Sequence, residues 1–238
     1  MADAKILPLA VVGLGFRVGD INVLDGATFD IAPGSRNIVL GPNGAGKSVM
    51  LRLLHGLLTP TSGRVGWSNP DALAVRRAQA MVFQRPVMLR RSARENVEFA
   101  LHVAGVRNVR NAADLALDRA GLMRLADRPA RLCSGGEQQR IALARAWALQ
   151  PEVLFLDEPT ASLDPAATNA IEEAVNAMHR AGTTIIMTTH DLGQARRLAD
   201  RVLFLNHGRL VEDAPAVSFF AQPTSPDAAA FIRGELLW

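Results

Sequence analysis

Short continuous runs of hydrophobic residues, each followed by a turn or by polar side chains, mark the strands of this chain. The clearest runs lie at residues 38–40, 80–83 and 153–156, and a further strand is expected at 184–188, where threonines flank an apolar centre. Runs without polar alternation are typical of a parallel sheet whose two faces are both covered. Segments near the start of the chain, at 9–12, 22–24 and 27–31, predict the short strands of an antiparallel sheet, with a turn at Gly13-Leu14-Gly15. Residues 64–67 predict another strand.

Helical spacing fills the segments between these runs. Residues 47–58 are apolar on nearly every face, which predicts a buried helix, and residues 85–130 are rich in Arg, Ala and Leu without a convincing strand. Ser134 and Glu137 have the spacing of a capping box, so a helix is expected from there to about Leu149. Asp164-Pro165 predicts another helix start. A hairpin is expected through Asn206-His207-Gly208.

These elements predict an α/β fold in a single domain over residues 1–238. Within it, residues 1–84 and 150–213 form a β-rich core and residues 85–149 an inserted helical subdomain. Residues 214–238 are expected to form a loop and a short helix. The length is sufficient for one large domain with a substantial buried core.

Composition excludes several classes of protein. The net charge of +3, from 26 Lys and Arg against 23 Asp and Glu, is too small to indicate nucleic-acid binding by itself. Cys133 is the single cysteine, which excludes an internal disulfide and fits a reducing compartment. No run approaches the roughly 18 to 20 apolar residues of a membrane span. A role at a membrane would therefore depend on a partner.

The strongest chemical motif follows the run 38–40: Gly41-Pro42-Asn43-Gly44-Ala45-Gly46-Lys47-Ser48. Glycine, four residues, then Gly-Lys-Ser between a strand and a helix is the pattern of a phosphate-binding loop. Its glycines let backbone N–H groups approach phosphate oxygens, and the helix N-terminus adds partial positive charge. Lys47 would contact the β- and γ-phosphates, and the Ser48 hydroxyl would ligate Mg²⁺. A Gly-rich turn without a ligand is the alternative.

Other polar residues stand where predicted strands and helices meet loops. Asp157 and Glu158 follow the run 153–156, at the carboxyl end where ligands of open α/β sheets bind. Gln84 and His190 each follow another strand. Gly135 and Gly136 leave the helix start after Ser134 without side chains, so an anionic group of another molecule could meet its N–H groups.

In this order, the motifs resemble the nucleotide-binding subunit of ATP-binding-cassette (ABC) transporters, and the resemblance covers essentially the whole chain. It implies a P-loop NTPase core of the RecA-like kind, with an N-terminal antiparallel β subdomain and an inserted α-helical subdomain. It also implies ATP and Mg²⁺ as substrate and cofactor. The ATP-contacting positions include the phosphate loop and Val49, which follows it.

The resemblance gives each polar residue a role. Asp157 would hold Mg²⁺ through its water shell, together with Ser48 and Gln84. Glu158 is similar to the general base that polarises the attacking water, and His190 to the histidine that contacts the γ-phosphate. Ser134-Gly135-Gly136-Glu137 would grip the nucleotide of a second copy, so two chains would enclose two ATP molecules head to tail.

Two positions depart from the family pattern. An aromatic side chain that stacks on adenine usually precedes the phosphate loop, but Val18 occupies that position here, and Phe16 is the candidate substitute. Cys133 stands where leucine usually begins the signature. A small apolar packing role is the plain interpretation of Cys133, and thiol sensitivity of the ATPase is a second hypothesis.

Arginines gather around the apolar triplet Val87-Met88-Leu89 just after Gln84: Arg85, Arg90, Arg91 and Arg94. A solvated basic surface is the ordinary explanation. In the family, a short helix of the membrane subunit docks beside this glutamine. We therefore hypothesise an exposed apolar patch rimmed by arginines.

The resemblance implies the ATP-hydrolysing subunit of an importer, peripheral to the cytoplasmic face of the plasma membrane. Its partners would be a second copy, membrane permease subunits and, indirectly, an extracytoplasmic solute-binding protein, with no nucleic acid. The stretch 84–92 and the ending 231–237 resemble tungstate-type oxyanion systems. Phosphate and amino-acid importers, and exporters or lipoprotein-release systems, are the alternatives. Soluble ABC ATPases of DNA repair or translation fit less well, because they carry a long coiled coil or two cassettes.

Overall fold

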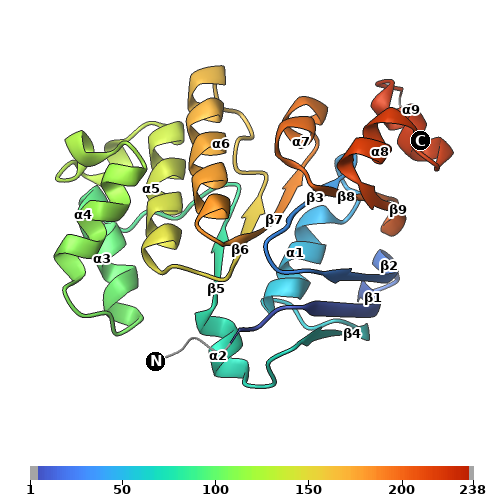
Figure 1. The fold of residues 1–238 in the computed structure, drawn as a ribbon, viewed down its shortest axis with the longest axis horizontal. Coiled ribbons are helices and arrows are strands. Elements are labelled where there is room, and N and C mark those ends of the chain that lie inside the picture. The colour runs from blue at the N-terminus through green and yellow to red at the C-terminus, as the bar shows by residue number, and fades with distance from the viewer. Residues whose placement is uncertain (1–4, 236–238) are drawn as a thin grey trace. The chain divides into compact units, whose positions relative to one another are not determined.

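A computed structural model describes residues 5–235 of the chain, which forms two compact units. The first unit comprises Met1–Arg76 with Thr184–Trp238, and the second comprises Arg77–Thr183. Figure 1 shows the ribbon coloured along the chain. Within the described residues, no helix has the length and apolar character that a membrane span requires.

The first unit begins with a three-stranded antiparallel sheet in the order β2-β1-β4. Its strands are β1 (Leu9–Val18), β2 (Ile21–Ile31) and β4 (Ser62–Trp67). The antiparallel N-terminal sheet is thus confirmed. The predicted turn at Gly13-Leu14-Gly15 is wrong, because the residues lie inside β1, where the register with β2 shifts. Gly13 lies at this register shift and has φ 59°, a left-handed conformation.

A second set of strands in this unit surrounds β3 (Arg36–Leu40). β7 (Thr184–Thr189) and β8 (Arg201–Asn206) both pair with β3 in parallel, and β9 (Arg209–Pro215) returns antiparallel to β8. β3 and β7 are buried along almost their full length, as the continuous apolar runs predicted. The parallel arrangement places the ends of β3 and β7 at the same edge, where the phosphate loop and His190 begin.

Among residues 5–235, the helices that belong wholly or mainly to the first unit are α1 (Lys47–His55), α2 (Ala72–Arg77), α7 (Leu192–Leu198), α8 (Ala216–Ala221) and α9 (Pro226–Ile232). α1 is shorter than the predicted 47–58, because Gly56 ends it with φ 83°. The C-terminal segment contains two short helices where one was predicted. Phe219 of α8 and Phe231 of α9 both pack against Phe204. Leu236 and Leu237, part of the predicted 231–237 motif, lie outside the described residues.

The second unit combines two parallel strands with helices. β5 (Gln79–Val82) pairs with β6 (Val153–Asp157), and the helices are α3 (Ala93–Val103), α4 (Val109–Arg119), α5 (Gly135–Ala148) and α6 (Pro165–Arg180). Two short 3₁₀ helices, η1 (Met123–Leu125) and η2 (Ala130–Leu132), precede α5. α3, α4 and α5 pack on one another (Figure 1), with Val97, Leu117 and Ile141 fully buried.

The predicted helix starts in this unit are confirmed at the level of single side chains. Ser134 and Glu137 form a capping box at α5, and the Asp164 carboxylate accepts the Ala167 N–H at α6, where Pro165 is the first residue. Residues 85–92 form no helix. They run as an irregular segment that ends in a second capping box, between Ser92 and Glu95 at α3.

Candidate nucleotide-binding site

The phosphate loop, residues 41–48, connects the buried strand β3 to α1. Lys47 is buried, and its Nζ donates to the carbonyl oxygens of Gly41 and Pro42 at 2.9 and 3.0 Å. The charge of Lys47 therefore lies over the loop itself. No side chain caps the N-terminus of α1, and its first turn contains no acidic residue. The N–H groups of this helix start carry partial positive charge and suit an anion.

Glycine is required at two positions of this loop. A Cβ on Gly41 would lie 2.1 Å from the Leu205 carbonyl oxygen, and one on Gly46 would lie 2.7 Å from that of Val23. Gly46 also has φ 98°, a conformation that other residues rarely adopt. The loop is thus an uncapped backbone cradle pressed against neighbouring strands, and this geometry fits phosphate oxygens.

Gly208 in the β8–β9 turn braces the loop, a role that the sequence did not reveal. Its N–H donates to the Ala45 carbonyl at 3.2 Å, while its own carbonyl accepts the Asp25 N–H at 2.8 Å. A Cβ on Gly208 would lie 2.8 Å from the Val23 carbonyl oxygen. The turn motif Asn206-His207-Gly208 predicted only a hairpin. Its link to the phosphate loop depends on contacts far apart in sequence.

His190 lies in the first unit, directly after β7. The next residue, Asp191, caps α7: its N–H donates to Thr189 Oγ1, and its carboxylate accepts the Gln194 N–H at 2.9 Å. The backbone on both sides of His190 is therefore fixed, by a buried strand before it and by a capped helix after it. The His190 side chain itself is exposed.

Asp157 and Glu158 lie at the end of β6 in the second unit. All five residues of β6 are buried, Asp157 included, so the strand fixes the backbone position of Asp157. Glu158 has φ 43°, a left-handed conformation that costs about 1–3 kcal/mol for a residue with a side chain. The Glu158 carbonyl accepts the Ala161 N–H at 3.1 Å, which closes a turn. Strain of this kind concentrates at functional positions.

The signature segment, residues 134–137, makes its own capping hydrogen bonds at the start of α5. Ser134 N–H donates to the Glu137 carboxylate at 2.8 Å, and Glu137 N–H donates to Ser134 Oγ at 3.3 Å. The first of these hydrogen bonds lowers the pKa of Glu137. Gly136 also serves packing, because a Cβ there would lie 2.8 Å from the Cβ of Ala167 on α6.

The segment after Gln84 is held by side chains from three elements of the second unit. Arg145 of α5 donates to the Val87 carbonyl at 3.1 Å, and Arg131 of η2 donates to the Met88 carbonyl at 3.0 Å. Leu89 N–H donates to Asn96 Oδ1 of α3 at 2.9 Å. Burial lowers the pKa of the Arg145 guanidinium from its usual value. Gln84 itself is exposed and follows β5 closely.

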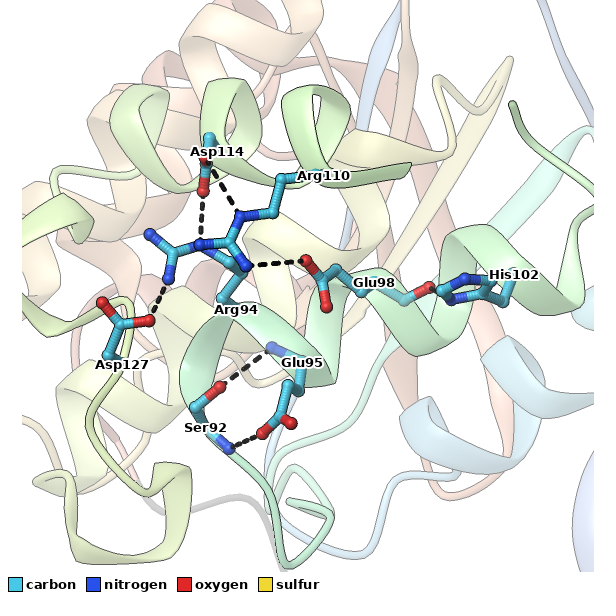
Figure 2. Close-up of polar contacts among 8 residues, drawn as sticks. All are labelled: Ser92, Arg94, Glu95, Glu98, His102, Arg110, Asp114 and Asp127. Atoms are coloured by element: carbon cyan, nitrogen blue, oxygen red, sulfur yellow. Dashed lines mark hydrogen bonds and ion pairs between the residues drawn. The ribbon is translucent and has the colours of Figure 1, made fainter. Parts of the chain in front are cut away.

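The hypothesised docking patch is only partly present. Val87 is 71% exposed, but Met88 is 4% exposed and packs inside the unit, so the triplet does not form one apolar surface. Arg94 is also not part of a basic rim. Figure 2 shows it paired with Asp114 and Asp127 beneath α4. Arg85, Arg90 and Arg91 are exposed, and Arg91 stacks over Phe99 at 5.5 Å from the ring centre.

Oxygen donors of the kind that Mg²⁺ prefers are present among the predicted metal ligands. Mg²⁺ usually takes one or two protein oxygens and fills its shell with phosphate and water oxygens. The Ser48 hydroxyl and the Asp157 carboxylate suit this mode. Across residues 5–235, no group of three or more His, Cys, Asp or Glu could hold a metal ion by itself.

Comparison with known proteins decides the family. Residues 24–161, more than half of the chain, match the family model described as ABC transporter. The chain belongs to the ABC transporter family. Its α/β fold with an antiparallel N-terminal sheet is the ABC ATPase fold, and the chain is an ABC-type ATPase that binds ATP.

Individual ABC proteins match over most of their length. The phosphate import ATP-binding protein PstB 2 of Natronomonas pharaonis is 38% identical over 97% of this chain and 88% of its own length. The tungstate uptake system ATP-binding protein TupC of Peptoclostridium acidaminophilum is 37% identical over 87% of this chain and 98% of its own length. The solved structure of CbiO1 from Clostridium perfringens, part of the ABC transporter complex CbiONQ, covers 92% of both chains at 30% identity and a TM-score of 0.81.

The two departures from the ABC pattern have different structural settings. Val18 ends β1 and is 58% exposed, whereas Phe16 lies two residues further inside the strand, opposite Leu24, and is half-buried. Cys133 directly follows η2 and is buried, and burial raises the pKa of its thiol. A buried thiol with a raised pKa carries little reactive thiolate. This setting favours the packing role of Cys133 over the hypothesis of thiol sensitivity.

Proposed function

We propose that this ABC protein hydrolyses ATP to drive the import of a small oxyanion, with tungstate as the first candidate cargo. The observation that carries the ATPase part is the uncapped phosphate loop, whose Lys47 charge lies over a backbone cradle. The similarity to PstB 2 and TupC, both named as uptake proteins for oxyanions, supports the class of cargo. Phosphate is the alternative within that class.

In the proposed mechanism, the phosphate loop and Val49 hold the phosphates, and Lys47 neutralises the β- and γ-phosphate charge. Ser48, Asp157 and Gln84 would hold Mg²⁺, which neutralises charge that develops during phosphoryl transfer. Glu158 accepts a proton from the attacking water, and His190 contacts the γ-phosphate. The left-handed backbone conformation of Glu158 supports its role as the base, because that conformation sets the direction in which the side chain projects at the end of β6.

A second copy of the chain completes the proposed site. The signature segment of one copy contacts the nucleotide held by the other copy, so a monomer hydrolyses ATP slowly. Ala161-Ser162-Leu163-Asp164 lies at the proposed interface, and Ser162 has φ 65° there. This proposal keeps the division of the domain into a core (1–84 and 150–213), a helical subdomain (85–149) and a C-terminal segment (214–238).

Membrane permease subunits are the proposed partners, which places the chain at the cytoplasmic face of the plasma membrane. The exposed side chains after Gln84, namely Val87 with Arg85, Arg90 and Arg91, are the proposed docking surface. The hydrogen bonds from Arg131 and Arg145 fix the backbone of that surface. A solute-binding protein would act through the permease.

Replacement of the general base tests the ATPase mechanism. Glu158→Gln should lower the ATP turnover about 100-fold or more, because a general base contributes that much. The variant should also retain ATP in a dimer, detected by gel filtration of the nucleotide-loaded protein. Glu173→Gln, which removes a carboxylate on the exposed side of α6, is the matched control and should keep wild-type turnover. Normal turnover in Glu158→Gln would remove Glu158 from this role.

Cargo and direction of transport need a second experiment. The chain is co-purified with its membrane subunits and reconstituted in vesicles together with the solute-binding protein of the same transport system. Tungstate should stimulate ATP hydrolysis more than phosphate or methionine at equal concentration. If only phosphate stimulated hydrolysis, phosphate would replace tungstate as the proposed cargo. Co-purification without any binding protein would favour an exporter or a lipoprotein-release system.

A further inference from the structure

Residues of the β8–β9 hairpin hold the C-terminal helix α9 near both of its ends. The buried Glu212 carboxylate of β9 accepts the Thr224 N–H at 3.0 and 3.1 Å and the Ser225 N–H at 2.9 Å, just before α9 begins. Phe231 of α9 packs on Phe204 of β8, with ring centres 5.3 Å apart. Figure 1 shows α9 beside β9. The position of α9 on this hairpin is therefore well defined.

A further contact joins α9 to the turn of the hairpin. Asn206, the last residue of β8, is 5% exposed, and its Nδ2 donates to Asp227 Oδ2 at 3.0 Å. Asp227 lies in the first turn of α9. A buried amide that loses its acceptor is costly to leave unsatisfied. Removal of the Asp227 carboxylate would therefore favour a shift of the backbone at Asn206, where the turn begins.

Residues close to Asn206 in the chain contact the phosphate loop. The Leu205 carbonyl oxygen lies so near Gly41 that a Cβ there would approach it to 2.1 Å, and the Gly208 N–H donates to the Ala45 carbonyl at 3.2 Å. The end of β8 and its turn thus contact the loop through backbone atoms and contact α9 through the Asn206 side chain. A shift of the turn would alter the support of the loop.

We propose that Asp227 is a positioning residue for the phosphate loop and that it acts through Asn206 and the brace at Gly208. This inference rests on the proposed function, since it requires a triphosphate in that loop. Asp227 itself contacts no nucleotide. It fixes the Asn206 amide and so keeps the Gly208 N–H on the Ala45 carbonyl. The N–H groups of the loop then remain in the arrangement that receives phosphate oxygens, so their affinity for phosphate depends on α9.

Binding of ATP and inorganic tripolyphosphate to the full-length chain tests the proposal, by calorimetry in a Mg²⁺-containing buffer. Asp227→Ala should weaken both ligands about tenfold, as expected when a residue acts on a site through its neighbours. Both should weaken equally, because the effect lies at the phosphates. Asp227→Asn keeps an oxygen that can accept from Asn206 and should bind both ligands within about twofold of wild type.

A double-mutant cycle shows whether the two side chains act as one pair. Asn206→Ala should reproduce the loss of affinity seen in Asp227→Ala. The variant with both changes should bind no more weakly than either single variant, because the second change removes a contact that is already absent. Additive losses would show that the two residues act separately and would contradict the proposed route.

Asp213→Ala is the matched control for stability. The Asp213 carboxylate accepts from Arg201 Nε and Nη2 at 2.6 Å each, so it also joins parts of the β8–β9 hairpin, but away from the turn. This variant should lower the free energy of unfolding in urea, as Asp227→Ala should, and should leave both affinities unchanged. The comparison separates loss of positioning from loss of stability.

Four outcomes bear directly against these proposals. Unchanged tripolyphosphate affinity in Asp227→Ala would overturn the inference and leave the proposed function intact. An equal loss in Asp213→Ala would assign the effect to the stability of the hairpin, and an equal loss in Asp227→Asn would assign it to charge rather than to the hydrogen bond. Absence of binding of both ATP and tripolyphosphate by the wild-type chain would instead overturn the proposed function, and this inference with it.

Discussion

The phosphate loop and the signature segment are both glycine-containing entries into a helix, yet they leave the helix N-terminus in opposite states. At α1, the N-cap residue is Gly46, which makes no side-chain cap hydrogen bond. At α5, Ser134 and Glu137 satisfy the helix start by themselves. The first entry lacks a side-chain cap, and the ligand proposed for it is a phosphate group. The second is complete without a ligand, so any nucleotide contact there must add to a finished structure.

The glycines of the two segments differ in the same way. Gly46 has φ 98° and faces the Val23 carbonyl, whereas Gly135 is helical and would bring a Cβ only to 3.8 Å from Leu163. Backbone conformation therefore requires glycine in the phosphate loop. In the signature segment, packing against α6 requires it only at Gly136.

The largest expected effect is the difference between two variants, each of which adds a methyl group at one of the two helix starts. Gly46→Ala should lower the free energy of unfolding by at least about 2 kcal/mol, because of its positive φ and a clash with backbone. It should also abolish ATP binding. Gly135→Ala should keep or slightly raise stability, since alanine favours a helix, and should keep ATP binding by the single chain. Urea unfolding and calorimetry provide both measurements. Equal loss of stability in the two variants would contradict the contrast.

A smaller effect is expected from the caps, and the chain provides a matched pair. Ser92 at α3 and Ser134 at α5 make the same capping box, so Ser92→Ala and Ser134→Ala should each cost about 1 kcal/mol of unfolding free energy. Only Ser134→Ala should also reduce the ATPase rate, measured at saturating ATP, if the Ser134 hydroxyl reaches the nucleotide of a second copy. A parallel loss of rate in Ser92→Ala would assign the effect to helix stability instead.

The smallest expected effect is a dependence on pH. The hydrogen bond from Ser134 N–H lowers the pKa of Glu137 below its usual 4.5. The unfolded state therefore binds the proton more readily, and the stabilisation from Glu137 is fully present above about pH 4.5 and is lost as the pH falls through the lowered pKa. Glu137→Gln should be less stable than wild type at pH 7, and the difference should shrink toward pH 3. Thermal unfolding at several pH values measures it, and a constant difference would contradict this role of Glu137.

Features that depend on neighbours in sequence were predictable. The phosphate loop, the capping box at Ser134 and the helix start at Asp164-Pro165 each depend on spacings of a few residues, and the structure has the last two as predicted. The family and its fold followed from several such motifs in a fixed order.

Features that depend on distant contacts were missed or wrong. Arg94 was predicted at the surface, but its carboxylate partners are 20 and 33 residues away in the chain, on elements whose packing the sequence does not reveal. Met88 is apolar like Val87, and only the fold decides that one is buried and the other exposed. The brace at Gly208 could not be inferred either, because its partners Ala45 and Asp25 lie in the first quarter of the chain.

The position of Gly208 also has a consequence for the order of events during synthesis on the ribosome. The phosphate loop leaves the ribosome first, and the turn that braces it and two strands that flank β3 follow only after the whole second unit has been made. A nascent chain that stops before residue 208 contains every residue of the loop without its support. We therefore expect nucleotide affinity to appear only after residue 208 has been synthesised.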